Sequence, residues 1–179
     1  EKLKEQNKEL IKRIAICKNN NIMTEMPKAT FYQFVDVPKY IEYNDNIIQI
    51  NNGKVSVTNN SEISYNTATR NGGGVYIGNG DFISDNSVII SYNNASIDGG
   101  GVFVKAEADE VILSGKFVGN TAKEEGGAIY VNHSQITKVK ESKFYGNIAR
   151  TYGGAIYLES NVSISLEDSI NMSGNTPNS

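Results

Sequence analysis

The sequence is poor in the residues that build disulfides, metal centres and catalytic triads. It contains one cysteine, Cys17, and one histidine, His133, in 179 residues. A single cysteine excludes an internal disulfide and a cysteine metal cluster, and a single histidine removes the usual zinc sites and His-based triads. We therefore expect no metal, no cofactor and no catalytic residues in this chain, and we expect His133 to be a surface residue rather than a ligand.

Long apolar runs and a strong net charge are also missing. No run approaches the roughly 18 apolar residues that span a membrane, and none resembles a secretory signal. The formal net charge of −3 is too small to attract nucleic acid. We expect no nucleic-acid partner and no membrane insertion by this part of the protein. Because the chain starts at Glu1 rather than Met and stops within a repeat, we interpret it as a fragment of a larger protein.

Glycine and asparagine take the place of apolar residues. The hydrophobic fraction is 39%, and the chain holds 17 glycines and 23 asparagines. Both residues weaken helix interiors and favour turns. With only three prolines and a varied sequence, the chain resembles neither collagen nor a disordered polymer. The composition predicts one non-helical domain.

A 27-residue repeat organises the chain from Asn51 onward. Four similar segments follow one another at this constant spacing: ISYNTATRNGGGVYI at 63–77, ISYNNASIDGGGVFV at 90–104, FVGNTAKEEGGAIYV at 117–131 and FYGNIARTYGGAIYL at 144–158. Each unit has three short apolar segments, one after the glycines, one in mid-unit and one leading to the asparagine. They are rich in β-branched and aromatic residues and are bounded by turn-forming residues, a pattern typical of strands.

Three strands in each exact repeat predict a coil rather than a meander. If one repeat completes one circuit, each strand lies beside its counterpart in the next coil, and parallel sheets enclose a shared core. Parallel crossovers are overwhelmingly right-handed. We therefore predict an all-β fold, a right-handed parallel β-helix with three strands per 27-residue coil, over residues 51–179, truncated at its C-terminus.

The apolar residues line up at this period. Three columns are predicted to face inward. They are Val75, Val102, Ile129 and Ile156; Ile77, Val104, Val131 and Leu158; and Ile63, Ile90, Phe117, Phe144 and, after a one-residue insertion, Met172.

The turn residues line up as well. We expect an asparagine column to bond from coil to coil through its side-chain amides and to tolerate left-handed backbone; it comprises Asn66, Asn93, Asn120, Asn147 and Asn175. We expect alanines two residues later to turn a tight corner; they are Ala68, Ala95, Ala122 and Ala149. Two glycine columns mark a second corner that needs positive φ or a close backbone approach; they are Gly72, Gly99, Gly126 and Gly153, followed by Gly73, Gly100, Gly127 and Gly154.

Residues 1–50 lie outside the regular repeat. Residues 1–22 begin with an amphipathic helical pattern, with one apolar stripe formed by Leu3, Leu10, Ile14 and Cys17. We predict a helix that either caps the neighbouring domain or forms a short coiled coil. Residues 23–50 are predicted to be a degenerate first coil or cap, since their last piece, NDNIIQI at 44–50, lies one repeat length before NGGGVYI at 71–77.

The motifs resemble a known repeat family. GGAIY at 126–130 and 153–157, paired with FVGN at 117–120 and FYGN at 144–147, is similar to the GGA(I/L/V) and FxxN repeats of the chlamydial polymorphic outer membrane proteins. The first two units depart from that pattern, with GGGV and with Ile in place of Phe. The resemblance covers residues 63–175. It implies a passenger region displayed at the cell surface or outer membrane, often ahead of an outer-membrane barrel, and acting in adhesion.

One column is a candidate binding face. Its members alternate with the inward columns and should face solvent; they are Tyr76, Phe103, Tyr130 and Tyr157. Stacked exposed rings suit a sugar or peptide partner. The alternative is that the rings stack only to stiffen the sheet.

Charged residues gather in the loops before the glycines. They are Arg70, Asp98, Lys123, Glu124, Glu125 and Arg150. Some parallel β-helices are polysaccharide lyases or pectin hydrolases, which need acidic or basic groups that converge in one groove. Here the aligned positions vary from coil to coil, so we interpret them as solvated loops.

These observations leave three functions to consider. The first is a surface-exposed, non-catalytic adhesin-type domain that binds a protein or glycan of a host or neighbouring cell. The second is a fibre or spike subunit that self-associates through the N-terminal helix or by coil stacking. The third is a carbohydrate-active enzyme.

Overall fold

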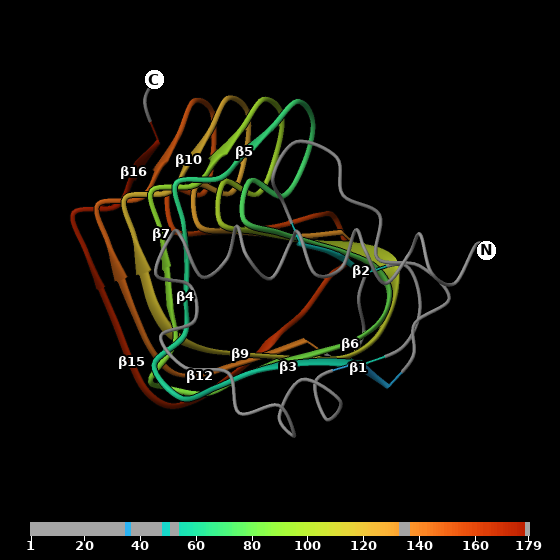
Figure 1. The fold of residues 1–179 in the computed structure, drawn as a ribbon. Helices are drawn as coiled ribbons and strands as arrows, with labels where there is room; N and C mark the ends of the chain where they lie inside the picture. Colours follow the sequence, from blue (N-terminus) through green and yellow to red (C-terminus); the bar gives the residue numbers. More distant parts are fainter. Residues whose placement is uncertain (1–34, 37–47, 51–53, 133–136, 178–179) are drawn as a thin grey trace.

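The computed structural model describes residues 35–36, 48–50, 54–132 and 137–177, which form an all-β parallel solenoid of about four turns without a helix. Successive coils lie one behind another, and β5, β10 and β16 lie in a smaller loop of chain beside the main coil (Figure 1). The strands are β1 (Val35–Asp36), β2 (Ile48–Ile50), β3 (Lys54–Val57), β4 (Glu62–Ser64), β5 (Thr67–Ala68), β6 (Val75–Ser84), β7 (Ile89–Ser91), β8 (Asn94–Ala95), β9 (Val102–Val118), β10 (Thr121–Ala122), β11 (Ile129–Val131), β12 (Thr137–Tyr145), β13 (Ile148–Ala149), β14 (Ile156–Leu158), β15 (Ser165–Ser173) and β16 (Thr176–Pro177).

The predicted register after the glycines is confirmed. Val102 pairs with Val75 in the preceding coil and with Ile129 in the next, and Ile129 pairs with Ile156, so each partner lies exactly one repeat away. Strands from neighbouring coils pair in parallel, whereas β1 pairs antiparallel to β3. Ile48 of β2 also pairs with Val75 one repeat later, so residues 48–50 occupy the place of the same strand one coil earlier.

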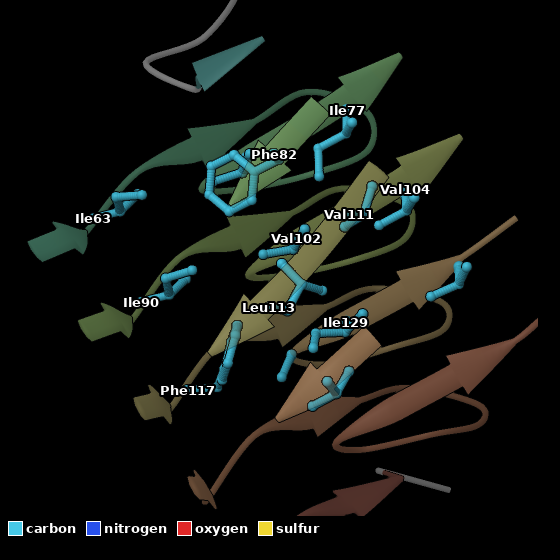
Figure 2. Close-up of a cluster of buried hydrophobic side chains, with 14 of the residues drawn as sticks. Ile63, Ile77, Phe82, Ile90, Val102, Val104, Val111, Leu113, Phe117 and Ile129 are labelled. Carbon is cyan, nitrogen blue, oxygen red and sulfur yellow. The ribbon is translucent and has the colours of Figure 1, made fainter. Parts of the chain in front are cut away.

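The three predicted columns form part of the core, together with buried mid-unit residues such as Phe82, Leu113 and Val139. Val75, Val102 and Ile129 are completely buried, as are Phe117 and Phe144, whose rings stack with centroids 4.7 Å apart. Figure 2 shows side chains of successive coils lying above one another in this core. In the last described coil, Met172 pairs with Phe144 as expected but is 45% exposed, because no further described coil covers it.

The division into three strands per coil is not confirmed. In one coil the three predicted segments run together as β9, a single strand of 17 residues, and in another β12 joins the second and third. Bulges, rather than breaks in pairing, carry the chain around several corners; one lies between Val139 and Ser142 of β12.

The mid-unit wall does not keep the period of the repeat. Phe82 pairs with Val55, which lies one repeat length earlier, but it also pairs with Val111, which lies two positions beyond one repeat length. Thr137 pairs with Val111 one position short of the repeat length. The inward side chains Phe82, Val111 and Thr137 nevertheless share one buried column. Loops and bulges between the walls therefore absorb the differences in length.

Two turn assignments are wrong. The alanines Ala68, Ala95, Ala122 and Ala149 do not turn a corner but lie in short strands of a separate five-stranded sheet of order β16-β13-β10-β8-β5. The left-handed residue at the other corner is not the asparagine but the residue before it. At that position φ lies between 52° and 64° in Tyr65, Tyr92, Gly119, Gly146 and Gly174.

The glycine corner is confirmed, and glycine is required for a different reason in each of its two columns. Gly72, Gly99 and Gly126 have φ between 65° and 70°, a backbone that L-residues rarely adopt. Gly127, in the second column, is needed for space: an added Cβ would lie 2.2 Å from the carbonyl oxygen of Gly154 in the next coil. The predicted helix over 1–22, most of the predicted cap over 23–50 and His133 lie outside the described residues.

Candidate functional site

An asparagine ladder links the coils inside one corner. The side-chain oxygen of Asn93 accepts hydrogen bonds from the backbone N–H and the side-chain amide of Asn66, at 3.0 and 2.9 Å. The amide nitrogen of Asn93 donates to Asn120 Oδ1 and to the carbonyl oxygen of Ile63. The same pattern continues through Asn147 to Asn175.

The ladder therefore bonds backbone as well as side chains. Asn120 and Asn147 are completely buried. Their hydrogen bonds within the ladder therefore replace the bonds to water that their amide groups lose on folding. The predicted amide-to-amide bonding is confirmed, and the bonds to the backbone make asparagine the residue that best fits this position. This column is scaffold rather than a binding site.

An aromatic ladder runs along the outer side of the strands that follow the glycines; we use this name for Tyr76, Phe103, Tyr130 and Tyr157. Neighbouring rings stack with centroids 5.3, 5.0 and 5.2 Å apart and interplanar angles of 3°, 9° and 25°. Parallel pairing at the spacing of one repeat places each ring against its counterpart in the next coil.

The predicted exposure of this ladder is wrong for its two central members. Phe103 is 5% exposed and Tyr130 is 4% exposed, while Tyr76 and Tyr157 are half-buried. Each central ring is covered on both faces by its neighbours, and the glycine corner lies against it. An added Cβ on Gly126 would lie 2.9 Å from Tyr130 Cβ. Stacking is thus observed, and a binding role for the four residues stays a prediction.

Carboxylates cap the C-terminal end of the aromatic ladder. The Tyr130 hydroxyl donates to the Glu159 carboxylate, and the Tyr157 hydroxyl bonds the Glu125 carboxylate. Asp98 Oδ1 accepts a hydrogen bond of 3.1 Å from the backbone N–H of Glu125. We call Asp98, Glu125 and Glu159 the acidic cap. The bond of Glu125 joins the loop before the glycines to the aromatic ladder of the next coil, and the bond of Glu159 joins the end of β14 to the ladder of the preceding coil.

Burial and mutual repulsion shift the pKa values in this cluster. Burial raises the pKa of Asp98 from 3.8 to about 6, against the opposing hydrogen bond from Glu125 N–H, and the charges of Glu124, Glu125 and Glu159 raise it further. Burial likewise raises the pKa of Glu125, although its bond to Tyr157 opposes the shift. Burial and the bond to Glu159 raise the pKa of Tyr130, which keeps its phenol protonated.

The remaining charged loop residues behave as predicted. Arg70, Lys123, Glu124 and Arg150 are exposed, as solvated loops should be. Asp98 and Glu125 are exceptions because they are half-buried and their backbones bond between coils. Among the described residues, no group of three or more His, Cys, Asp or Glu side chains is arranged to hold a metal ion.

Sequence reasoning missed a stacked pair of exposed aromatic side chains. Tyr65 and Tyr92 are 73% and 52% exposed and stack with centroids 5.2 Å apart. They occupy the left-handed position before the asparagine ladder, which holds glycine in the later coils. The sequence does contain a signal of this pair: the residue before the asparagine is tyrosine in two units (SYN) and glycine in the next two (VGN and YGN). A position that also accepts glycine can have positive φ, where tyrosine is unusual.

Comparisons with known proteins agree with the repeat. A family model, the Chlamydia polymorphic membrane protein repeat, matches residues 114–132 and 141–159. Searches of curated proteins and of solved structures found no match. The described residues include no helix that is long and apolar enough to cross a membrane. Both matched segments contain the buried phenylalanine, the ladder asparagine and the glycine corner, so the resemblance inferred from the sequence is confirmed over these two segments.

Proposed function

We propose that the chain is part of a non-catalytic passenger domain, displayed at the cell surface or outer membrane, that attaches to a protein or glycan of another cell. The observation that carries this proposal is the separation of scaffold from surface. The residues that define the repeat, such as Phe117, Asn120 and Gly127, are buried, whereas exposed positions such as Lys123 and Arg150 differ from coil to coil. A rigid stack with a variable surface suits recognition, and the family match supports surface display.

Attachment of coated beads to cells tests this proposal. Beads that carry the 179-residue chain should attach to cultured epithelial cells in a saturable way, and the free chain should compete. Beads that carry the heat-denatured chain are the matched control. Equal attachment of both kinds of bead would contradict a role for the folded surface.

The C-terminal edge of the stack favours a second candidate, a fibre subunit. Within the described residues, β14, β15 and β16 each pair on one side only, and Leu166 and Met172 of β15 are 55% and 45% exposed. A strand edge with exposed apolar side chains is a ready site for pairing. A second copy stacked there would extend the sheets.

Sedimentation velocity separates the two candidates. If the chain is a fibre subunit, its sedimentation coefficient should rise with protein concentration. Leu166→Lys combined with Met172→Lys should prevent this rise, because the new charges repel each other when two copies approach through this edge. A monomer at every concentration contradicts the fibre and is the result we expect for a passenger domain.

The absence of catalysis is part of the proposal and has its own test. The third candidate, a carbohydrate-active enzyme, would need working carboxylates, and Glu124 and Glu125 are adjacent carboxylates in the loop before the glycines. A screen for degradation of polysaccharides should show no turnover. Turnover that disappears in Glu124→Gln or Glu125→Gln would overturn the proposed function in favour of an enzyme.

A further inference from the structure

One outer wall of the coil carries a pair of lysines that form no ion pair with a carboxylate of the described residues. Lys116 of β9 and Lys143 of β12 are partners in adjacent parallel strands, and both side chains are exposed. Like charges in directly opposite positions repel each other. Among the described residues, carboxylates pair with Lys54 and Lys138 but with neither of these two lysines. A bound anion between the two ammonium groups would relieve their repulsion.

The two lysines line a surface cavity of about 300 Å³, together with Asn86, Gly115, Glu141 and Ser169. The cavity lies at the bulge of the wall, where Gly115 has φ of 123° and Glu141 has φ of 45°. An added Cβ on Gly115 would lie 2.3 Å from the carbonyl oxygen of Val88, so only glycine fits the backbone there. The bulge leaves the two lysines beside a hollow rather than on a flat sheet.

The lining combines positive charge with groups that bind hydroxyls. The Asn86 amide nitrogen donates to the Glu141 carboxylate, which leaves the Asn86 side-chain oxygen and the second Glu141 oxygen as acceptors. Two lysines and one glutamate give the cavity a net charge of +1. Sugar hydroxyls can donate to these acceptors while a carboxylate lies between the ammonium groups. The volume is at the small end of ligand sites, which span about 300 to 1,000 Å³, and it suits one sugar unit.

The exposed tyrosine pair, Tyr65 and Tyr92, lies near the same wall. Gly119 directly follows the end of β9 and lies three residues after Lys116, about 10 Å away at 3.3 Å per residue. The ring of Tyr92 lies over Gly119, since an added Cβ there would be 2.7 Å from Tyr92 Cε1. A sugar unit beyond the one in the cavity would thus reach an exposed aromatic side chain, the residue type that commonly contacts sugar rings.

We propose that this wall binds a glycan with a carboxylate-bearing sugar, whose carboxylate lies between Lys116 and Lys143 and whose neighbouring unit contacts Tyr92. This inference rests on the proposed function, because it names the partner class of a surface-exposed binding domain. It is specific to the cavity at the bulge. The exposed lysine Lys123, in the loop before the glycines, plays no part in it.

Titration calorimetry of the full chain tests the proposal with sialyllactose and a hyaluronan tetrasaccharide as acidic probes and lactose as the neutral control. At least one acidic glycan should bind, and lactose should bind about tenfold more weakly, the factor that corresponds to one charge-assisted contact. Lys116→Gln combined with Lys143→Gln should weaken binding by about the same factor or more. The matched control Lys123→Gln should bind like the wild type.

Several results would overturn this inference. They are no binding of either acidic glycan, equal binding of lactose, and unchanged binding in the double variant. Preferred binding of a polyglutamate peptide would overturn it in favour of an acidic protein partner. Bead attachment to cells, measured in parallel, keeps the two proposals distinct. If attachment persists without acidic-glycan binding, this inference fails and the proposed function stands, whereas absence of attachment by the wild-type chain contradicts the proposed function.

Discussion

Among single residues, tyrosines of this chain occupy two contrasting environments. Tyr130 stacks between Phe103 and Tyr157, is 4% exposed and donates its hydroxyl to Glu159. Tyr65 also stacks, but only on one described neighbour, and it is 73% exposed. Aromatic stacking alone therefore does not bury a ring in this fold; the adjoining glycine corner and the acidic cap do so for Tyr130.

This contrast predicts different effects of the same substitution. Tyr130→Ser should lower the free energy of unfolding by about 3 to 4 kcal/mol, the usual cost of deleting a buried aromatic ring. Tyr65→Ser should change it by less than about 1 kcal/mol, as expected for an exposed site. Urea denaturation of both variants measures the difference. Similar losses would show that the two rings are equally buried in solution, contrary to the structure.

Asp98 predicts an unusual dependence of stability on pH. Its pKa of about 6 in the folded chain lies above its ordinary value of 3.8. Between these values the folded state binds more protons than the unfolded state, so the contribution of Asp98 to stability is lost as pH rises from about 4 to 6. Above pH 6 the charged carboxylate remains destabilising. Because Asp98 is only half-buried, we expect a contribution of about 1 kcal/mol.

The Asp98→Asn variant isolates this effect. It keeps a side-chain oxygen for the backbone N–H of Glu125 but cannot ionise. Thermal unfolding should show that the variant is more stable than the wild type at pH 7.5 and that this advantage shrinks toward pH 4. An advantage that does not vary with pH would rule out titration of Asp98 as its cause.

At the scale of elements, the glycine corner is the least tolerant part of each coil. In Gly127→Ala the new Cβ would meet backbone atoms, at 2.2 Å from Gly154 O and 2.6 Å from Ile148 C. Neighbouring coils would have to separate, and we expect a loss of more than about 3 kcal/mol. Gly146 has φ of 60° but no atom within 4 Å of an added Cβ, so Gly146→Ala should cost about 1 to 2 kcal/mol from backbone strain alone. Denaturation midpoints of the two variants test this order, and the reverse order would contradict the close approach of the coils.

At the scale of the whole molecule, the asparagine ladder is a continuous polar link between the coils from Asn66 to Asn175. In Asn120→Ala, two donors of Asn93 lose their acceptor, and the side-chain bonds to Ile90 O and Asn147 Oδ1 also disappear. Leaving buried polar groups unpaired should lower the free energy of unfolding by about 3 kcal/mol. Asn171→Ala, at an exposed position of β15, should change it by less than about 0.5 kcal/mol. Chemical denaturation measures both values, and comparable losses would contradict the role of the ladder.

Much of the scaffold could be predicted because residues one repeat length apart in the sequence are neighbours in adjacent coils. A residue such as Val102 meets its counterparts in the repeats before and after it, so identical residue types at that spacing identify a column. The inward columns, the asparagine ladder and the glycine corner all follow from this argument. The alanine corner was wrong because small residues are compatible with a corner and equally with the short strands of a second sheet. The irregular offsets of the mid-unit wall were hidden because bulges restore the register that the sequence spacing loses.

The candidate sites were less predictable, since a period contains no information about the outer face. Alternation correctly places Tyr130 opposite the core, but it cannot tell that the glycine corner and Glu159 cover the ring. In the same way, no spacing rule brings Asn86 to Glu141, which lies two coils further along the chain and bonds it at the edge of the cavity.

By itself, the sequence determined which residues stack on which in the columns that keep the 27-residue interval, because those contacts recur once in each coil, whereas the offset pairs of the mid-unit wall came from the structure alone. It also determined where glycine and asparagine were needed, since few other residues fit those backbones and bonds. Only the tertiary structure decided which outward side chains meet solvent. That depends on how the chain between the ladder and the glycines folds back over the coil, on the positions of the bulges, and on the burial that shifts the pKa of Asp98. The scaffold is therefore local and periodic, whereas the surfaces available to a partner are products of the assembled stack.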